Sequence, residues 1–145
     1  MESAGTVVDY LESGLSTFKN NIIAVYTKPF NVDSAGARAV IKTYPDNPMS
    51  STDRTNMINE AITLVRNKAE SDGNTVLDSR EAVGLTSPFD LSAPNFLPGG
   101  ASPALTGASF TGLDAFFTSV SYKGAFGSTD WTAGWTNFNP RTSTY

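Results

Sequence analysis

Proline and glycine divide the second half of the chain into short apolar phrases, and this constrains the fold more than any other feature of the sequence. Residues 82–145 hold five of the eight prolines and eight of the twelve glycines. Proline removes a backbone donor and glycine weakens helices and strands from within, so long regular elements are excluded there. We expect this half to wrap over a core formed elsewhere and to insert large apolar side chains into it. The candidate anchors are Phe89, Leu91, Phe96, Leu97, Leu105 and Phe110.

Charge and aromatic content change at the same place in the chain. Residues 1–81 carry nineteen of the twenty-four charged side chains, whereas residues 82–145 carry eleven of the sixteen aromatic ones. A chain of 145 residues has the length of one ordinary domain, and neither half alone would bury much core. We therefore predict a single unit over 1–145. It has strand-like rungs over 1–50, a helix over 51–72, and a proline-, glycine- and aromatic-rich wrap and cap over 82–145.

The strongest local signal is an amphipathic helix over 51–72. Apolar residues recur there at helical spacing: Met57, Ile58, Ala61, Ile62, Leu64, Val65 and Ala69. Ser51, Thr52 or Asp53 is expected to cap the first N–H groups of this helix. Gly73 is expected to supply a left-handed residue at its end. We expect the apolar face to pack against a neighbouring sheet.

Three runs before this helix are rich in β-forming residues and are predicted to be short strands. They are GTVVDYLE at 5–12, STFKNNIIAVYTK at 16–28 and ARAVIKTYP at 37–45. Asn20 and Asn21 interrupt the strongest of them, where asparagine is unfavourable for a strand. Because asparagine tolerates left-handed backbone and bonds its own chain, the pair predicts a sharp corner between short strands.

Composition removes several classes of function. A net charge of −4 supplies no electrostatic surface for nucleic acid, and no apolar run approaches the roughly 20 residues that span a bilayer. The chain has no histidine and no cysteine, which excludes the commonest general base, thiolate nucleophiles and disulfides. Of the remaining acids, Asp90, Asp114 and Asp130 are isolated, and each is expected to serve a turn or a cap. We therefore expect no catalytic site, no metal and no cofactor.

Several C-terminal phrases together resemble a known group of proteins. SPALTGA at 102–108, GAFG at 124–127, and DWT with GWT within 130–136 resemble the C-terminal region of large secreted or surface proteins of Bacteroidota. The resemblance covers about residues 87–140 and implies a right-handed parallel β-helix. The implied fold is mainly β: a short β-helix-like end with one accessory amphipathic helix and a glycine- and aromatic-rich C-terminal cap. The resemblance also implies an extracellular or outer cell-surface location, with the signal peptide, absent from this sequence, removed or trimmed.

The segment YKGAFGSTDWTAGWTNFNP at 122–140 is the main candidate for a binding site. Tyr122, Trp131, Trp135 and Phe138 are the candidate ligand-binding residues, because aromatic faces can hold the apolar faces of sugar rings. The other interpretation is that these aromatics plug the end of the β-helix, where exposed strand groups and apolar interior have to be covered. We expect the plug.

The expected function is that of a non-enzymatic extracellular structural or cell-surface protein. A chain too short to close its own solenoid leaves a β edge uncapped, and such an edge invites pairing with a second copy in an oligomer or filament. Two alternatives stay open. The tryptophan pair suits a carbohydrate-binding surface module with a glycan as partner. The resemblance also allows the non-catalytic end of a polysaccharide-processing β-helix enzyme.

Overall fold

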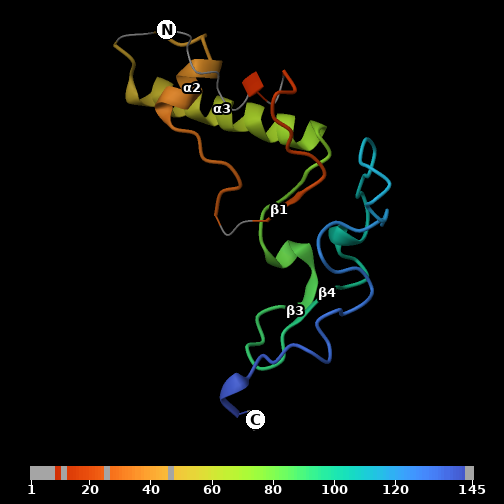
Figure 1. Cartoon of the computed structure of the whole chain (residues 1–145). Helices are drawn as coiled ribbons and strands as arrows, with labels where there is room; N and C mark the ends of the chain where they lie inside the picture. Colours follow the sequence, from red (N-terminus) through yellow and green to blue (C-terminus); the bar gives the residue numbers. More distant parts are fainter. Residues whose placement is uncertain (1–8, 11–12, 25–26, 46–47, 143–145) are drawn as a thin grey trace.

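The structure, a computed structural model, describes residues 9–10, 13–24, 27–45 and 48–142. Its elements in chain order are β1 (Ile22–Ala24), α2 (Ser34–Val40), α3 (Ser51–Ser71), β2 (Thr75–Leu77), η1 (Glu81–Val83), β3 (Leu85–Ser87), β4 (Asn95–Pro98), η2 (Pro103–Leu105) and η3 (Pro140–Thr142), where η marks a single 3-10 turn. Helices α2 and α3 lie at one end of the molecule, and the β3–β4 pair and η3 lie at the other (Figure 1). That the whole chain folds as one unit stays a prediction.

The predicted fold class, mainly β with a β-helix-like end, is wrong. The described residues form two sheets of two strands each, and none of these strands exceeds four residues. β1 and β2 pair in parallel, with Ile22 opposite Thr75 and Ala24 opposite Leu77. The chain between them forms two helices rather than further rungs, and strands this short and few cannot stack into a solenoid. The aromatic cap predicted for the end of a β-helix therefore has no β-helix to cover.

The predicted helix over 51–72 is confirmed as α3, although its cap differs from the expected one. Ser50 accepts a hydrogen bond from the Asp53 N–H at 3.0 Å and donates its hydroxyl to the Asp53 carboxylate at 2.8 Å. This pair of bonds closes the first turn of the helix and places a negative charge at its positive end. At the other end, Gly73 has the expected left-handed backbone, with φ at 80°.

The strand predicted over 37–45 is wrong, because its first residues belong to α2. Asp33 caps this helix by accepting a hydrogen bond from the Gly36 N–H at 2.7 Å. Alanine is the strongest helix former, and three alanines fall within the seven residues of α2. The β-branched residues that suggested a strand, Val40 and Ile41, lie where the helix ends.

The other two predicted strands had different outcomes. The run 16–28 contributes only β1, and the run 5–12 lies mostly outside the described residues. The corner predicted at the asparagine pair is confirmed, because Asn20 has φ at 59°. Among the described residues it is the one non-glycine position with left-handed backbone, a conformation that asparagine tolerates better than most residues.

α3 packs against α2 rather than against a sheet. The centre of this contact consists of Ala37, Ile41, Met57 and Ala61, each at most 7% exposed. Partly buried apolar residues surround it: Val32, Val40, Tyr44, Met49, Ile58 and Leu64. In the described part of the chain, Met57 is the one large side chain that is fully buried. The main buried cluster is therefore small and lies at the helical end, and Ala104 is a separate buried apolar residue in the second half.

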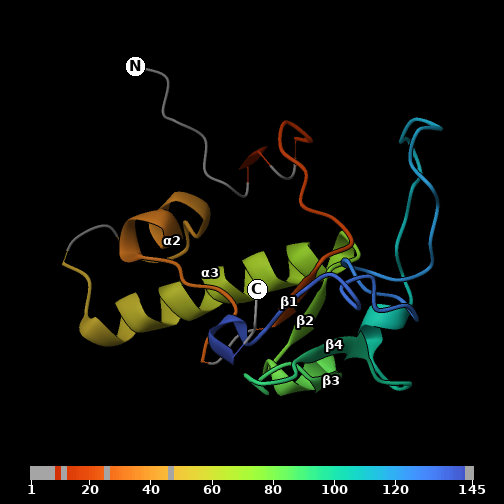
Figure 2. The same cartoon turned by 60° about the horizontal axis from the view of Figure 1, so that its bottom comes forward.

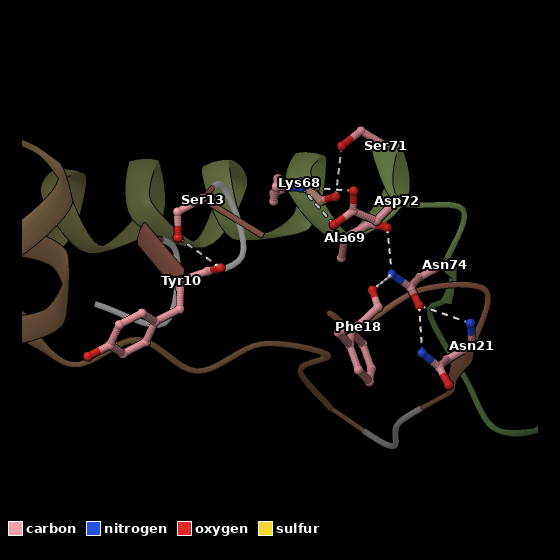
Figure 3. Close-up of polar contacts among 9 residues, drawn as sticks. All are labelled: Tyr10, Ser13, Phe18, Asn21, Lys68, Ala69, Ser71, Asp72 and Asn74. Atoms are coloured by element: carbon pink, nitrogen blue, oxygen red, sulfur yellow. Dashed lines mark hydrogen bonds and ion pairs between the residues drawn. The ribbon is translucent and has the colours of Figure 1, made fainter. Parts of the chain in front are cut away.

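Asn74 joins the end of α3 to the segment that leads into β1 (Figure 3). Its side-chain amide donates to the carbonyl groups of Phe18 at 2.7 Å and Ala69 at 2.8 Å. Its side-chain oxygen accepts from the backbone N–H and from the side-chain amide of Asn21, both at 2.9 Å. Asn74 is only 5% exposed, and these four bonds use its full hydrogen-bonding capacity. Because Thr75 follows directly, Asn74 fixes the start of the β1–β2 pairing.

Side-chain-to-backbone hydrogen bonds take the place of regular structure in the second half. At several turns a side chain accepts a hydrogen bond from the N–H group two residues further on. The accepting residues include Asp90, Asn95, Ser102, Ser109, Asp114, Asp130 and Asn137. The predicted turn role of the three aspartates is thus confirmed. Two of the predicted anchors, Phe89 and Leu91, are exposed instead of inserted into a core.

Candidate functional site

Five aromatic side chains form a continuous ladder in the second half of the chain. Its members, in order of contact, are Phe138, Phe96, Phe126, Trp131 and Trp135. The ring centroids of successive members lie 6.2, 5.8, 5.2 and 5.9 Å apart. The first contact is edge-to-face, whereas the last two are stacked with interplanar angles of 15° and 23°. Each such contact stabilises by about 0.5–1.5 kcal/mol beyond area burial, so this aromatic ladder fastens the C-terminal segment to β4.

Both tryptophans of the ladder have their polar edges bonded to backbone and their rings exposed. Trp131 Nε1 donates to the Ala125 carbonyl at 3.0 Å, and Trp135 Nε1 donates to the Trp131 carbonyl at 2.6 Å. Trp131 is 51% exposed and Trp135 is 69% exposed. Because Trp131 stacks on one face of Trp135, the other face of Trp135 forms the open end of the ladder. The rings are therefore held in fixed orientations with apolar surface toward solvent.

Three of the four predicted ligand-binding residues meet in the ladder, and Tyr122 lies apart from it. Trp131, Trp135 and Phe138 are members. The ring of Tyr122 lies against the buried Gly127, where an added Cβ would come within 2.5 Å of the tyrosine Cε1 atom. A side chain at position 127 would collide with this ring, so the tyrosine packs on a surface that only glycine leaves free.

Two turns of like sequence adjoin the ladder: Asp90-Leu-Ser-Ala and Asp130-Trp-Thr-Ala. In the first, the Asp90 carboxylate accepts from the Ser92 hydroxyl at 2.6 Å and from the Ser92 N–H at 2.9 Å. In the second, the Asp130 carboxylate accepts from the Thr132 hydroxyl at 2.5 Å and from the Thr132 N–H at 2.9 Å. The hydroxyl bond, followed by the N–H bond, lowers the pKa of each carboxyl. Both carboxyls are ionised at neutral pH, which does not suit a general acid.

A polar hollow of about 530 Å³ lies between the segments that follow these two turns. The residues that line it are Ser92, Ala93, Pro94 and Asn95 on one segment and Asp130, Thr136, Asn137, Phe138 and Asn139 on the other. Amide, carboxylate and hydroxyl groups therefore surround a space that also contacts one aromatic ring. The Thr136 hydroxyl oxygen is buried and has no hydrogen-bond partner in the described part of the chain. Because this oxygen is closed off from solvent, a ligand in the hollow has to bond other groups of the lining.

The polar hollow and the ladder are neighbours. Phe138 belongs to both, and each tryptophan of the ladder is adjacent in sequence to a residue of the hollow, Asp130 or Thr136. The arrangement offers exposed aromatic faces beside several hydrogen-bonding groups. It can hold a ligand by stacking and hydrogen bonding, and the described residues contain no cluster of acidic side chains placed to hold a metal ion.

The sequence interpretation missed the polar hollow, although a signal for it is present. DLSAPNF at 90–96 and DWTAGWTNF at 130–138 both begin with Asp-x-Ser/Thr-Ala and end with Asn-Phe. In the structure the two phenylalanines contact each other, and the two asparagines make the same turn bond, Asn95 to the N–H of Leu97 and Asn137 to the N–H of Asn139. Comparison of these two phrases would have predicted a pair of like turns, and their contact creates the hollow.

Comparisons with known proteins add no further assignment to this site. No family model, no curated protein and no solved structure matches the chain. The resemblance to surface proteins of Bacteroidota therefore stays a prediction. Within the described ranges, none of the helices combines the length and the apolar character needed to cross a membrane.

Proposed function

We propose that this chain is a non-enzymatic carbohydrate-binding surface protein. The proposal rests chiefly on the exposed tryptophan pair beside the polar hollow. A sugar ring has apolar C–H faces, which stack on an aromatic face, and a rim of hydroxyl groups, which need donors and acceptors. The outer face of Trp135 supplies the first kind of contact, and the amide, hydroxyl and carboxylate groups around the hollow supply the second.

The chemistry of the hollow favours a neutral ligand. Its charged residue is Asp130, whose ionised carboxylate accepts hydrogen bonds from hydroxyl groups but repels anions. No lysine or arginine of the described ranges lines the hollow, so an acidic polysaccharide or a phosphate finds no counter-charge among these residues. We therefore assign the ligand class as neutral oligo- or polysaccharide.

The fold gives little support to the other functions that were expected from the sequence. Assembly through an uncapped β-helix edge lacks support, because two-stranded sheets with strands of three or four residues leave few backbone groups to pair. A role as the non-catalytic end of a polysaccharide-processing enzyme stays a prediction that no described contact favours. The extracellular or cell-surface location also stays a prediction.

The test is binding of the whole chain to neutral polysaccharides by affinity electrophoresis and calorimetry, with laminarin, xyloglucan and soluble starch as probes. We expect retention by at least one of them. Trp135→Ala should weaken that binding about tenfold or more, because one stacking surface is lost. Leu15→Ala is the matched control, since Leu15 is 78% exposed and lies far along the chain from the hollow.

A second variant separates binding from stability. Asn95→Asp keeps the side-chain oxygen that accepts from the Leu97 N–H, so the fold should be retained, while the side-chain amide donor of this lining residue is lost to the sugar. We expect unchanged thermal unfolding and weaker binding. A wild-type chain that binds none of the three probes, or a Trp135→Ala variant that binds as wild type, would overturn the proposal.

A further inference from the structure

A second hollow, of about 240 Å³, lies where the second half of the chain meets β1, and its lining is mainly apolar. The large apolar residues around this apolar hollow come from four elements and one loop: Ile22, Val83, Leu85, Phe96, Pro98 and Phe126. Figure 2 shows the β1–β2 pair next to the β3–β4 pair, and the lining residues place the hollow between them. All six side chains are half-buried, so their own chain covers them only in part.

The backbone polar groups around the apolar hollow are already bonded within the chain. The carbonyl groups of Val83, Ala104 and Ala125 accept hydrogen bonds at 2.5, 2.7 and 3.0 Å. Leu85 and Pro98 face each other in the β3–β4 pairing. A sugar in this hollow would lose the water around its hydroxyl groups and find few partners in exchange, which is unfavourable. The apolar hollow therefore disfavours the ligand class that suits the polar hollow.

The charged residue of the lining, Lys123, directs its ammonium group away from the apolar residues. Its Nζ atom donates to the Gly73 carbonyl at 3.0 Å and to the Thr75 hydroxyl at 3.2 Å, and neither residue lines the hollow. A lysine can lay its methylene stem along apolar surface while its charge is bonded elsewhere. Among the described residues no acidic side chain lines the hollow, so a cation finds no counter-charge there. These contacts favour an uncharged ligand.

The volume of the apolar hollow limits the size of that ligand. An apolar cavity of about 150 Å³ lined by aliphatic and aromatic side chains holds one benzene ring, and it stays free of water when empty. At the same ratio of ligand to space, about 240 Å³ holds a molecule of about ten non-hydrogen atoms. This is the size of one aromatic ring with a short substituent.

Two aromatic rings in the wall favour an aromatic ligand over an aliphatic one. The rings of Phe96 and Phe126 lie 5.8 Å apart with an interplanar angle of 33°. Their neighbours in the aromatic ladder, Phe138 and Trp131, contact them as well, so both rings are held in place before a ligand arrives. A third ring can meet them edge-to-face or offset, and such contacts stabilise beyond the burial of apolar area.

We propose that the apolar hollow binds one uncharged aromatic molecule of up to about ten non-hydrogen atoms. Bound there, it covers apolar groups in a part of the molecule that buries few of its own. In the described part of the second half, Ala104 is the one buried apolar side chain. The ligand contacts Ile22 of β1 as well as residues of the second half, so its binding also holds these two parts together.

The first test is titration of the whole chain with fluorobenzene, followed by fluorine NMR, and with toluene, followed by thermal unfolding. We expect a saturable shift of the fluorine resonance. We also expect Tm to rise with toluene concentration, because a ligand that binds only the folded chain stabilises it. Benzoate, which has a charge on a ring of the same kind, should bind more weakly. A wild-type chain that shows no saturable shift, or that binds benzoate more tightly than fluorobenzene, would overturn the proposal.

A variant tests the location of the site. Ala125 is an exposed residue of the lining, and Ala125→Leu adds apolar atoms that take up part of the space. This change should raise the dissociation constant of fluorobenzene about tenfold or more. Ala115→Leu is the matched control, since it adds the same atoms at an exposed position outside the lining, and it should leave binding unchanged. Equal affinity in both variants would overturn the assignment to this hollow.

Hydrogen exchange of the wild-type chain with and without toluene locates the ligand without any substitution. We expect slower exchange in the segments 22–24 and 123–126, which meet at the apolar hollow. Protection confined to residues 136–139 would place the ligand in the polar hollow and would overturn the proposal. None of these measurements involves a sugar, so their failure is separate from failure of carbohydrate binding.

Discussion

Replacing Asn74 by alanine removes a side chain that connects the end of α3, the segment before β1 and the start of β2. Four hydrogen bonds of 2.7–2.9 Å are lost at a position that is 5% exposed. The groups left behind are not equivalent. The Ala69 carbonyl keeps a bond from the backbone N–H of residue 74 at 3.1 Å, and the Asn21 side-chain amide keeps the Lys19 carbonyl at 3.0 Å. The backbone N–H of Asn21 loses the bond that Asn74 supplied.

The expected cost follows from this inventory. Each lost hydrogen bond lowers the free energy of unfolding by about 0.5–1.5 kcal/mol. The loss is smaller where water replaces Asn74 and larger for the N–H group left without a partner, so the total is about 3 kcal/mol. For a chain of this size 1 kcal/mol corresponds to about 2–4 °C in Tm, so Asn74→Ala should lower Tm by about 6–12 °C. Asn21→Ala is the matched control, because it removes one bond to Asn74 and keeps the backbone N–H in place. It should cost about 1 kcal/mol.

The assay is urea unfolding of both variants followed by circular dichroism at 222 nm, with the free energy of unfolding taken from the midpoint. A loss below about 1 kcal/mol for Asn74→Ala, or equal losses for both variants, would refute the reasoning, because the bonds would then be replaceable by solvent.

Asn74→Asp adds a test by pH. Its new oxygen would face the carbonyl groups of Phe18 and Ala69, which disfavours the ionised form and raises its folded pKa. That variant should be most stable below pH about 4 and lose stability as pH rises.

Three further outcomes are expected. Gly127→Ala places a Cβ 2.5 Å from the ring of Tyr122 and should lower the free energy of unfolding by about 1–3 kcal/mol. An unchanged free energy of unfolding would refute the close packing. Gly73→Ala forces a side chain into left-handed backbone after α3 and should cost about 1–2 kcal/mol in the same urea assay. Asp130 has a lowered pKa from its bonds to Thr132, so the stability it confers is present above its ordinary pKa and is lost as pH falls. Asp130→Asn should therefore show a shallower decline of the urea midpoint between pH 6 and pH 3, and an unchanged decline would contradict this.

Features set by near neighbours in the chain were predictable from sequence. The helix α3 follows from apolar spacing and from glycine at its end, and the corner at Asn20 follows from the backbone tolerance of asparagine. The turn roles of the aspartates were predictable for the same reason, since each bonds an N–H two residues away. In these cases the interactions that determine the structure join residues only a few positions apart.

Features set by distant partners were not predictable in this way. Val40 and Ile41 suggested a strand, but an aspartate cap and three alanines outweighed them, and the packing of α2 on α3 completes the helix pair. The fold class rested on a resemblance over about residues 87–140 and on strand-like runs in 1–50, and the described part of the first half forms only two strands of three residues each. The polar hollow depends on contact between Phe96 and Phe138, which are forty-two positions apart. A local pattern cannot specify such a contact, although the repeated phrase indicates it.

The parallel pairing of β1 with β2 also determines the order of events during synthesis. Asn21 and Asn74, which fix this pairing, are separated by 53 positions, so β1 has no partner when it leaves the ribosome. The helix pair between them depends on contacts closer in sequence and should form first, since nearby contacts close at lower entropic cost. A nascent chain halted after α3 would then expose β1 to other proteins, and the arrival of residues 74–77 would end that exposure.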